Sequence, residues 1–326
     1  MKLLIGVVAV LFLYSCEVEP INNSFKLTVP KGFPEISVPN DNALSLERIA
    51  LGKRLFYDPI LSKDSTISCN SCHFQEYAFA DNRSISPGVE ERLGKRNSMS
   101  LANVAYADVL LREGGVPNLE MQVLVPIQEH NEMDFYIVAV AERMQSDSSY
   151  VKQSLEAYNR MPDAFVITRA IASFERTLLS GNSRYDSNIL SASEKNGRDL
   201  FFSDSLACSS CHGTFLFTNQ EMENNGLYEQ YPDSGRYVLT RLQEDIGRFK
   251  VPSLRNVELT SPYMHDGSLS TLEQVVSHYE SGGSNHFNQS NLVKGFNLTS
   301  EERASLIAFL QSLTDYEFTQ NTLFKE

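Results

Sequence analysis

The segment Cys69–His73 reads Cys-Asn-Ser-Cys-His, and the segment Cys208–His212 repeats the pattern as Cys-Ser-Ser-Cys-His. Four cysteines in two pairs are compatible with disulfides, with zinc knuckles or with a thioredoxin-type redox pair. Zinc-ribbon pairs lie about 15–20 residues apart, whereas these pairs are much farther apart in the chain. Neither a disulfide nor a redox pair accounts for a histidine directly after each pair.

A histidine after each Cys-x-x-Cys pair is the signature of covalent haem attachment. Two thiols at this spacing can bind the two vinyl groups of one haem, and the adjacent histidine then reaches the iron. The sequence therefore predicts two haem c groups, attached through Cys69, Cys72, Cys208 and Cys211, with His73 and His212 as proximal iron ligands.

The residues before each motif also repeat. Glu47–Phe56 and Glu194–Phe201 both have apolar residues at helical spacing and a glycine, Gly52 or Gly197, where a helix can approach a neighbour closely. Each copy therefore predicts a helix followed by a haem-binding loop.

The rest of the chain favours helices over strands. Residues 135–144 and 164–179 have apolar side chains three and four positions apart, and Thr299 with Glu302 forms a capping box before a last helix. Segments 218–250 and 281–298 have the composition of long loops. We predict a mainly α fold of two cytochrome c-like haem domains in tandem, at residues 41–185 and 186–326.

The first residues indicate export. Residues 1–16 have a positive start and an apolar run too short to span a bilayer, and Leu13–Cys16 resembles a lipobox. We predict a signal peptide over residues 1–16, lipidation of Cys16 and a tether over residues 17–40. The protein is then a periplasmic or outer-membrane-associated lipoprotein, attached to the membrane only through its lipid.

The composition narrows the possible partners. The chain has 326 residues, 42% of them hydrophobic, and a formal net charge of −13. An acidic chain of this kind is not expected to bind nucleic acid or an anionic membrane surface. The charge suits a basic electron-transfer partner, although it does not identify one.

Several segments between Asn42 and Asp315 resemble the bacterial di-haem cytochrome c peroxidase family, which includes the MauG-type enzymes. The segments that carry the resemblance are Leu51–Asp58, Thr66–His73, Arg96–Asn97, Val251–Val257 and Ser261–Ser268. The resemblance implies that hydrogen peroxide reacts at the N-terminal haem and that the C-terminal haem relays electrons. It also implies a small electron-donor protein, either a cytochrome c or a cupredoxin, and a possible homodimer.

The family has a glutamine and, ten residues later, a glutamate on the distal side of the N-terminal haem. Gln122, Pro126 and Glu132 match this pattern, which implies catalytic roles for Gln122 and Glu132. A carboxylate can move a proton between the peroxide oxygens, and an amide can orient the peroxide. The alternative is that Glu132 is an ordinary surface carboxylate at the start of a helix.

Ordinary family members have a second histidine on the resting N-terminal iron. The matching position is Val89, and no other histidine lies close to it in sequence. We therefore expect an N-terminal iron with an open or water-bound sixth position. His130 is the nearest competitor, but we expect it to be a solvated loop residue.

Tyr279 occupies the position of the usual sixth ligand of the C-terminal iron, a methionine, and resembles MauG-type proteins in this respect. A phenolate stabilises higher oxidation states of iron than a thioether does. Met264 and His278 remain alternative ligands, and His265 is expected to be structural.

Four further residues bear on the junction between the domains. Asn97, Thr260 and Pro262 match a calcium site of the family, the last two through their carbonyl oxygens. Arg112 stands where the family usually has a tryptophan between the haems, and the chain contains no tryptophan. A guanidinium cannot be oxidised as an indole can, so electron hopping through this residue should be lost.

The leading hypothesis is a peroxidase that reduces hydrogen peroxide with electrons from a small redox protein. The second is a MauG-like enzyme that oxidises residues of a partner protein, which Tyr279 and Val89 favour and Arg112 disfavours. The third is a non-enzymatic di-haem electron carrier, which would have six-coordinate iron at both sites.

Overall fold

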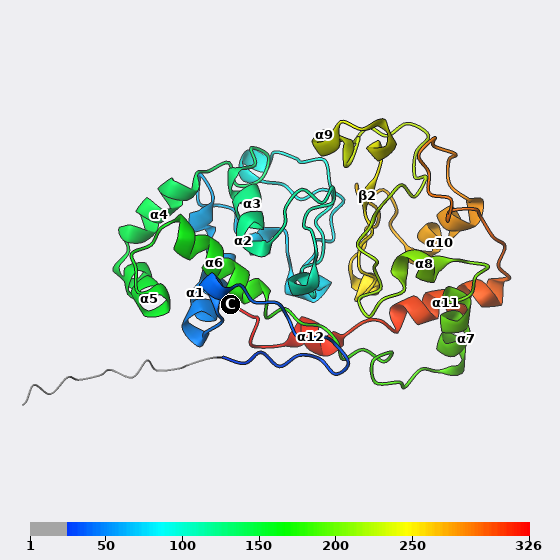
Figure 1. Cartoon of the computed structure of the whole chain (residues 1–326), viewed down its shortest axis with the longest axis horizontal. Coiled ribbons are helices and arrows are strands. Elements are labelled where there is room, and N and C mark those ends of the chain that lie inside the picture. Colours follow the sequence, from blue (N-terminus) through cyan, green and yellow to red (C-terminus); the bar gives the residue numbers. More distant parts are fainter. Residues whose placement is uncertain (1–24) are drawn as a thin grey trace, which may run out of the picture.

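The computed structural model describes residues 25–326, and it confirms a mainly helical architecture of two domains, each with one Cys-x-x-Cys-His segment. The two domains lie side by side, with α1–α6 in the first and α7–α11 in the second (Figure 1). The predicted signal segment and Cys16 lie outside the described residues.

Most of the first domain consists of short helices and turns. Its α-helices are α1 (Leu46–Tyr57), α2 (Leu119–Gln122), α3 (Leu124–Gln128), α4 (Ile137–Gln145), α5 (Ser148–Tyr158) and α6 (Ala164–Glu175). Six 3-10 turns precede α2, at Asn40–Asn42, Pro59–Leu61, Cys69–Ser71, Gln75–Tyr77, Val89–Glu91 and Val104–Tyr106.

The second domain also consists mainly of short helices and turns, with fewer helices than the first. It contains α7 (Ala192–Phe201), α8 (Cys208–His212), α9 (Tyr237–Thr240), α10 (Leu272–Ser281) and α11 (Ser300–Gln311), and α12 (Tyr316–Gln320) follows. The strands β1 (Met222–Glu223) and β2 (Phe249–Lys250) pair antiparallel, and 3-10 turns cover Gln243–Asp245 and Val257–Leu259. The predicted capping box is present at the start of α11. There the Glu302 backbone N donates to the Thr299 hydroxyl at 3.2 Å.

A close helix crossing organises each domain, and a glycine makes it possible. A Cβ atom on Gly52 of α1 would lie 1.8 Å from the Ala170 carbonyl oxygen of α6. One on Gly197 of α7 would lie 1.8 Å from the Ser305 carbonyl oxygen of α11. Since no side chain fits at either distance, the helix in front of each haem motif depends on glycine to pack against its partner.

The cores form around these crossings. In the first domain Leu51 and Leu55 of α1 are fully buried with Ile167 of α6. In the second, Phe201 of α7 packs against Phe309 of α11, with ring centroids 5.2 Å apart.

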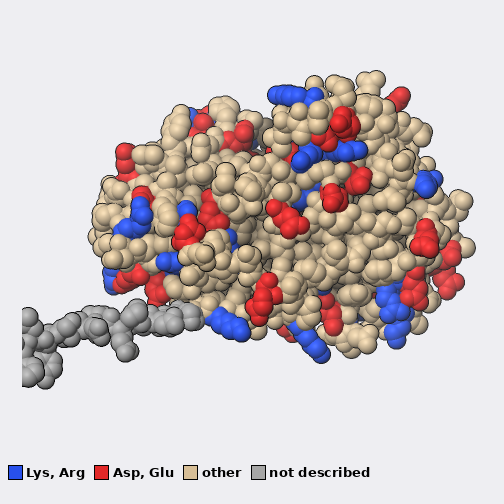
Figure 2. Space-filling view, in the orientation of Figure 1, with Lys and Arg blue, Asp and Glu red and all other residues tan. Residues whose placement is uncertain are grey.

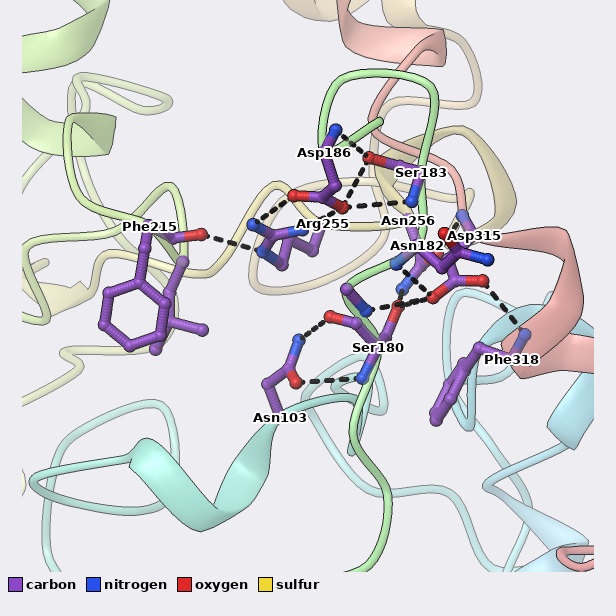
Figure 3. Close-up of polar contacts among 12 residues, drawn as sticks. Asn103, Ser180, Asn182, Ser183, Asp186, Phe215, Arg255, Asn256, Asp315 and Phe318 are labelled. Atoms are coloured by element: carbon purple, nitrogen blue, oxygen red, sulfur yellow. Dashed lines mark hydrogen bonds and ion pairs between the residues drawn. The ribbon is translucent and has the colours of Figure 1, made fainter. Parts of the chain in front are cut away.

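The connection between the domains is ordered by a buried polar network around Ser180 (Figure 3). Asn103 Nδ2 donates to the Ser180 carbonyl at 2.8 Å, and Ser180 N donates to Asn103 Oδ1 at 2.9 Å. From the other domain, Asn256 Nδ2 donates to Ser180 Oγ at 2.9 Å. Asn103 and Asn256 are both left-handed and both precede a 3-10 turn, so the structural repeat extends to the residues that hold the connection.

Three charged residues, Asp315, Arg255 and Asp186, complete this network (Figure 3). Asp315 accepts hydrogen bonds from the backbone amides of Gly181 and Asn182, each at 2.9 Å. Arg255 binds both carboxylate oxygens of Asp186, at 2.9 and 3.0 Å. The connection therefore has fixed partners in both domains.

The chain ends do not follow the division expected from the sequence. After α11 the chain crosses back, and α12 lies beneath the first domain with the C-terminus near α1 (Figure 1). Phe318 and Phe324 pack with Phe79 in the first domain. Near the other end Phe33, assigned to the tether, packs against Phe215 of the second domain with ring centroids 4.8 Å apart. Apolar side chains near both ends therefore fasten the two domains together.

Among the described residues, no helix has the length and apolar character needed to cross a membrane.

We predict that Gly197→Ala destabilises the holoprotein by about 1–3 kcal/mol, the usual cost of overpacking a core, because the methyl group would overlap the Ser305 carbonyl of α11. Chemical denaturation followed by haem absorbance measures the effect. Gly94→Ala is the matched control, since a Cβ atom there meets nothing within 4 Å. Equal stabilities of the two variants would contradict the close crossing.

Candidate haem and peroxide sites

One continuous cavity of about 1130 Å³ runs through both domains and is lined by both Cys-x-x-Cys-His segments. Typical small-molecule pockets have about 300–1,000 Å³, so this space suits large cofactors. Every site residue predicted within the described part of the chain lines it: Cys69, Cys72, His73, Asn97, Gln122, Glu132, Cys208, Cys211, His212, Thr260, Pro262 and Tyr279.

His73 is oriented by the backbone that follows it. Its Nδ1 lies 2.8 Å from the Phe79 carbonyl oxygen. A carbonyl only accepts, so Nδ1 carries the proton and Nε2 keeps its lone pair for a metal. Phe79 is left-handed at φ 59°, and this turn brings its carbonyl back to the ring. Burial also lowers the pKa of His73, which favours the neutral, metal-binding form.

His212 repeats this arrangement. Its Nδ1 lies 2.8 Å from the Phe217 carbonyl oxygen, and Phe217 is left-handed at φ 54°. Burial lowers its pKa as well. The four cysteines of the two motifs form no disulfides and have their thiols directed to the cavity. Both sites therefore present two thiols and one imidazole nitrogen, which fits a covalently attached haem.

Gln122 and Glu132 reach the His73 part of the cavity from one compact segment. Gln122 is the last residue of α2. Glu132 follows α3 in a turn that is closed by backbone hydrogen bonds. Glu132 N donates to the Glu129 carbonyl, and the Val89 amide donates to the Glu132 carbonyl at 2.8 Å. Val89 is itself buried and does not line the cavity, so the residue in place of the usual histidine helps to hold Glu132.

Glu132 lines the cavity and is exposed to it. Desolvation by the neighbouring protein, together with a smaller contribution from the Glu129 carboxylate, raises its pKa to about 7. A group of this kind changes protonation near neutral pH, as a general acid–base catalyst must. His130 lies outside the cavity lining, exposed, and contacts Arg92 and Asp134.

The sequence did not point to Glu175, a buried carboxyl group at this cavity. Glu175 ends α6 and lines the cavity, and its Oε2 has no hydrogen-bond partner among the described residues. Burial raises its pKa to about 8. Glu175 is therefore protonated and uncharged at neutral pH.

Tyr279 of α10 enters the His212 part of the cavity, close to the Cys208 and Cys211 thiols. Burial raises the pKa of its hydroxyl group, and a hydrogen bond from Asn225 opposes this shift. The net shift favours the neutral phenol, and the Asn225 amide only reduces it. Asn225 follows the short strand β1, and sequence reasoning did not single it out.

Both alternative ligands are engaged by the same asparagine. His278 Nε2 donates to the Asn225 carbonyl at 3.0 Å, and the His278 side chain does not line the cavity. The Met264 sulfur accepts a hydrogen bond from Asn225 Nδ2 at 3.3 Å. Tyr279 and Met264 both line the cavity, whereas His278 does not, so Tyr279 stays the predicted sixth ligand with Met264 as its alternative.

Charged residues hold the junction of the domains beside the cavity. Arg96 binds Asp233 of the second domain at 2.6 Å and also pairs with Glu113. The Lys250 amide of β2 donates to the Arg112 carbonyl at 2.6 Å, and Lys250 Nζ donates to the Val109 carbonyl at 2.8 Å.

His265 stacks on Phe249, with ring centroids 4.1 Å apart and an interplanar angle of 18°. Burial lowers its pKa. Its backbone carbonyl accepts a hydrogen bond from the Asn97 amide at 2.8 Å, which joins the two domains.

The three predicted calcium ligands line the same cavity, and Arg112 contacts one of them. Both oxygens of Asn97 accept hydrogen bonds from Arg112, at 3.0 Å for the carbonyl oxygen and 2.9 Å for Oδ1. The Thr260 and Pro262 carbonyls line the same cavity. The side-chain oxygen that calcium would need is therefore already bound to a cation.

Two haem-attachment segments on two helical domains define a di-haem c-type cytochrome. Residues 46–195 match the family model described as di-haem cytochrome c peroxidase, and residues 194–314 match the cytochrome c model. The chain belongs to the di-haem cytochrome c peroxidase family, which includes MauG. It is an oxidoreductase with two covalently bound haem c groups.

Relatives under both family names match at similar levels. The chain is 33% identical to cytochrome-c peroxidase IdrP1 of Pseudomonas sp. strain SCT, over 86% of this chain and 84% of the relative. It is 32% identical to the methylamine utilization protein MauG of Methylophilus methylotrophus, over 85% of each chain. A solved MauG-like protein associated with microbial copper homeostasis superposes with a TM-score of 0.89 at 33% identity, over 92% of this chain and 99% of that one.

We predict that Tyr279→Met raises the midpoint potential of the C-terminal haem, on the order of a few hundred millivolts within the roughly 0.8 V range that axial ligands span. A neutral thioether stabilises the reduced iron relative to a phenolate. Spectroelectrochemical titration of the holoprotein measures the change.

Tyr263→Phe is the matched control for this variant, because Tyr263 is another partly buried tyrosine that lines the cavity. It should leave the potential of the C-terminal haem unchanged. An unchanged potential in Tyr279→Met would exclude Tyr279 as the ligand.

Proposed function

We propose that this protein is a peroxidase that reduces hydrogen peroxide to water at the His73 site, with electrons delivered through the His212 site. The observation that carries the proposal is the carboxyl group of Glu132, which has a pKa of about 7 and lines the cavity at His73. The structure has no histidine at position 89 to compete for the iron. Relatives named cytochrome-c peroxidase and cytochrome c551 peroxidase support the same reaction.

The reaction consumes one peroxide, two protons and two electrons and yields two waters. Haem at His73 supplies the iron at which peroxide is reduced. Glu132 as carboxylate accepts the proton of one peroxide oxygen and returns it to the other, which leaves as water. The Gln122 amide donates a hydrogen bond that orients the peroxide.

The electrons come from outside the protein, and a cytochrome c or a cupredoxin is the proposed class of donor. On the face shown in Figure 2, acidic and basic side chains are interspersed. A donor that docks on this face would therefore be guided by local pairs of charges rather than by a field of one sign. Arg112 cannot carry an electron itself, so transfer between the haems proceeds by tunnelling past it.

A MauG-like reaction, in which peroxide drives the oxidation of residues on a partner protein, is the second candidate. Tyr279 beside Asn225 favours it, because a phenolate ligand stabilises oxidised iron. Turnover of peroxide with a reduced cytochrome c supports the peroxidase, whereas a stable peroxide-oxidised state that the donor does not discharge supports the MauG-like reaction.

The third hypothesis, a pure electron carrier, requires six-coordinate iron at both haems. The Val89 side chain cannot bind iron, and His130 lies outside the cavity. A high-spin ferric signal that shifts on addition of cyanide excludes the carrier.

The proposed setting is the exterior of the cytoplasmic membrane, with a lipid on Cys16 as anchor and a homodimer as the assembled form. Detergent-dependent partitioning of the full chain, lost in Cys16→Ser, tests the anchor. The proposed function requires no calcium ion, since Arg112 already binds the Asn97 oxygens.

We predict that Glu132→Gln lowers kcat/KM for peroxide by about 10²–10⁴-fold, the usual contribution of general acid–base catalysis. The wild-type rate should rise with pH through about 7, as Glu132 loses its proton and becomes a base. In Glu132→Gln this rise should disappear. Steady-state oxidation of reduced cytochrome c from pH 5 to 9, in steps of about one unit, measures both effects.

Glu129→Gln is the matched control. It removes a negative charge that raises the pKa of Glu132, so the rate profile should move to lower pH while the maximal rate is retained. Equal rates for Glu132→Gln and wild type would exclude Glu132 as the proton-transfer group.

A further inference from the structure

Arg112 and Asn97 form a bidentate contact at the junction of the two domains. The guanidinium donates from Nε to the Asn97 carbonyl oxygen at 3.0 Å and from Nη2 to Asn97 Oδ1 at 2.9 Å. One side chain thus binds both oxygens of the residue that would be the side-chain ligand of a calcium ion. The planar fork of arginine suits this pair of acceptors.

The remaining polar groups of Asn97 are also satisfied. Its backbone amide donates to the His265 carbonyl at 2.8 Å, and its Nδ2 donates to the Arg83 carbonyl at 3.0 Å. Each Asn97 oxygen that could bind a metal ion therefore already accepts a hydrogen bond from a cation, so a second cation at either oxygen would be repelled by the guanidinium. Buried polar groups that lose their partners carry a desolvation penalty.

The charges around the junction also disfavour a divalent cation. Within residues 25–326, no carboxylate lies within ion-pair distance of Arg112 or Lys250. The nearest acidic groups are engaged elsewhere, since Asp233 binds Arg96 and Asp266 accepts a hydrogen bond from Tyr228 at 2.6 Å. Asp233 and Asp266 act on Arg112 only from beyond ion-pair distance, so a calcium ion here would face the like charges of Arg112 and Lys250.

Two backbone oxygens remain available beside this contact. The Thr260 and Pro262 carbonyls accept no hydrogen bond from the part of the chain that the structure describes. Calcium takes about 6–8 oxygen ligands and usually includes carboxylates among them. Two neutral carbonyls next to a guanidinium do not meet this requirement.

We infer that the Arg112 guanidinium takes the place of a calcium ion at the domain junction, so that this protein is independent of calcium. The chain itself supplies the cation that binds the Asn97 oxygens, and backbone hydrogen bonds of the same two residues join the domains. The Arg112 carbonyl accepts from the Lys250 amide of β2, and Asn97 hydrogen-bonds to His265 of the second domain. Burial lowers the pKa of Arg112 to about 10, which still leaves it charged at neutral pH.

Calcium analysis of the purified di-haem protein tests this inference, whatever its substrate. We expect far less than one calcium per chain by plasma mass spectrometry. Neither EGTA nor millimolar calcium chloride should change Tm or the electron paramagnetic resonance spectrum of the ferric haems. One calcium per chain in the purified protein, or a rise in Tm on adding calcium, would overturn the inference.

Arg112→Gln tests whether the guanidinium is what keeps calcium out. This variant frees the Asn97 oxygens and should lower Tm by about 2–4 °C. Added calcium chloride should then raise Tm. A folded Arg112→Gln protein that does not respond to calcium would overturn the inference, and if the variant does not fold, the wild-type calcium content decides.

Lys250→Gln is the matched control. It removes a buried positive charge from the same cavity but leaves the contact between Arg112 and Asn97 intact. We expect no calcium response in this variant. A response equal to that of Arg112→Gln would show that total charge, rather than occupation of the Asn97 oxygens, excludes the ion, and would contradict the proposed role of Arg112.

Discussion

The hydrogen bond from Nδ1 of each motif histidine to a backbone carbonyl is the constraint on which both haem sites depend. In each domain it runs from the histidine to the carbonyl of a left-handed phenylalanine, Phe79 or Phe217, at 2.8 Å. It directs Nε2 into the cavity and fixes the tautomer that binds metal. The phenylalanine side chains pack into the core beside the crossing helices, so the position of the imidazole is determined by the core of the domain.

The two domains share this arrangement around the motif histidine but place different side chains at the cavity. The first half places two titratable carboxyl groups at the cavity, Glu132 and Glu175, because helices α2–α3 and α6 border it. The second half places Tyr279 of α10 there, with Asn225 beside it. A site surrounded by acidic groups suits proton transfer, whereas an anionic ligand suits the storage of oxidising equivalents.

Mostly buried polar contacts hold the domain that carries Glu132 against the domain that carries Tyr279. Ser180 is held by one asparagine from each domain, and Arg112 holds Asn97 where a metal ion was expected. Buried hydrogen bonds of this kind are costly to leave unpaired, so the relative placement of the domains is well defined. Phe318 packing on the first domain strengthens the same junction from the far end of the chain.

The sequence by itself determined the two haem motifs, the glycine-bearing helices in front of them and the capping box of α11, because each depends on local spacing and residue chemistry. The resemblance to a family also brought Glu132 and Tyr279 to attention. Only the tertiary structure decided that Arg112 binds both oxygens of Asn97, that Asn225 contacts Tyr279, and that Glu175 is buried at the cavity. These depend on contacts between residues far apart in the chain, which spacing cannot reveal. The two motifs that predicted equivalent haems thus became unequal sites through their long-range neighbours.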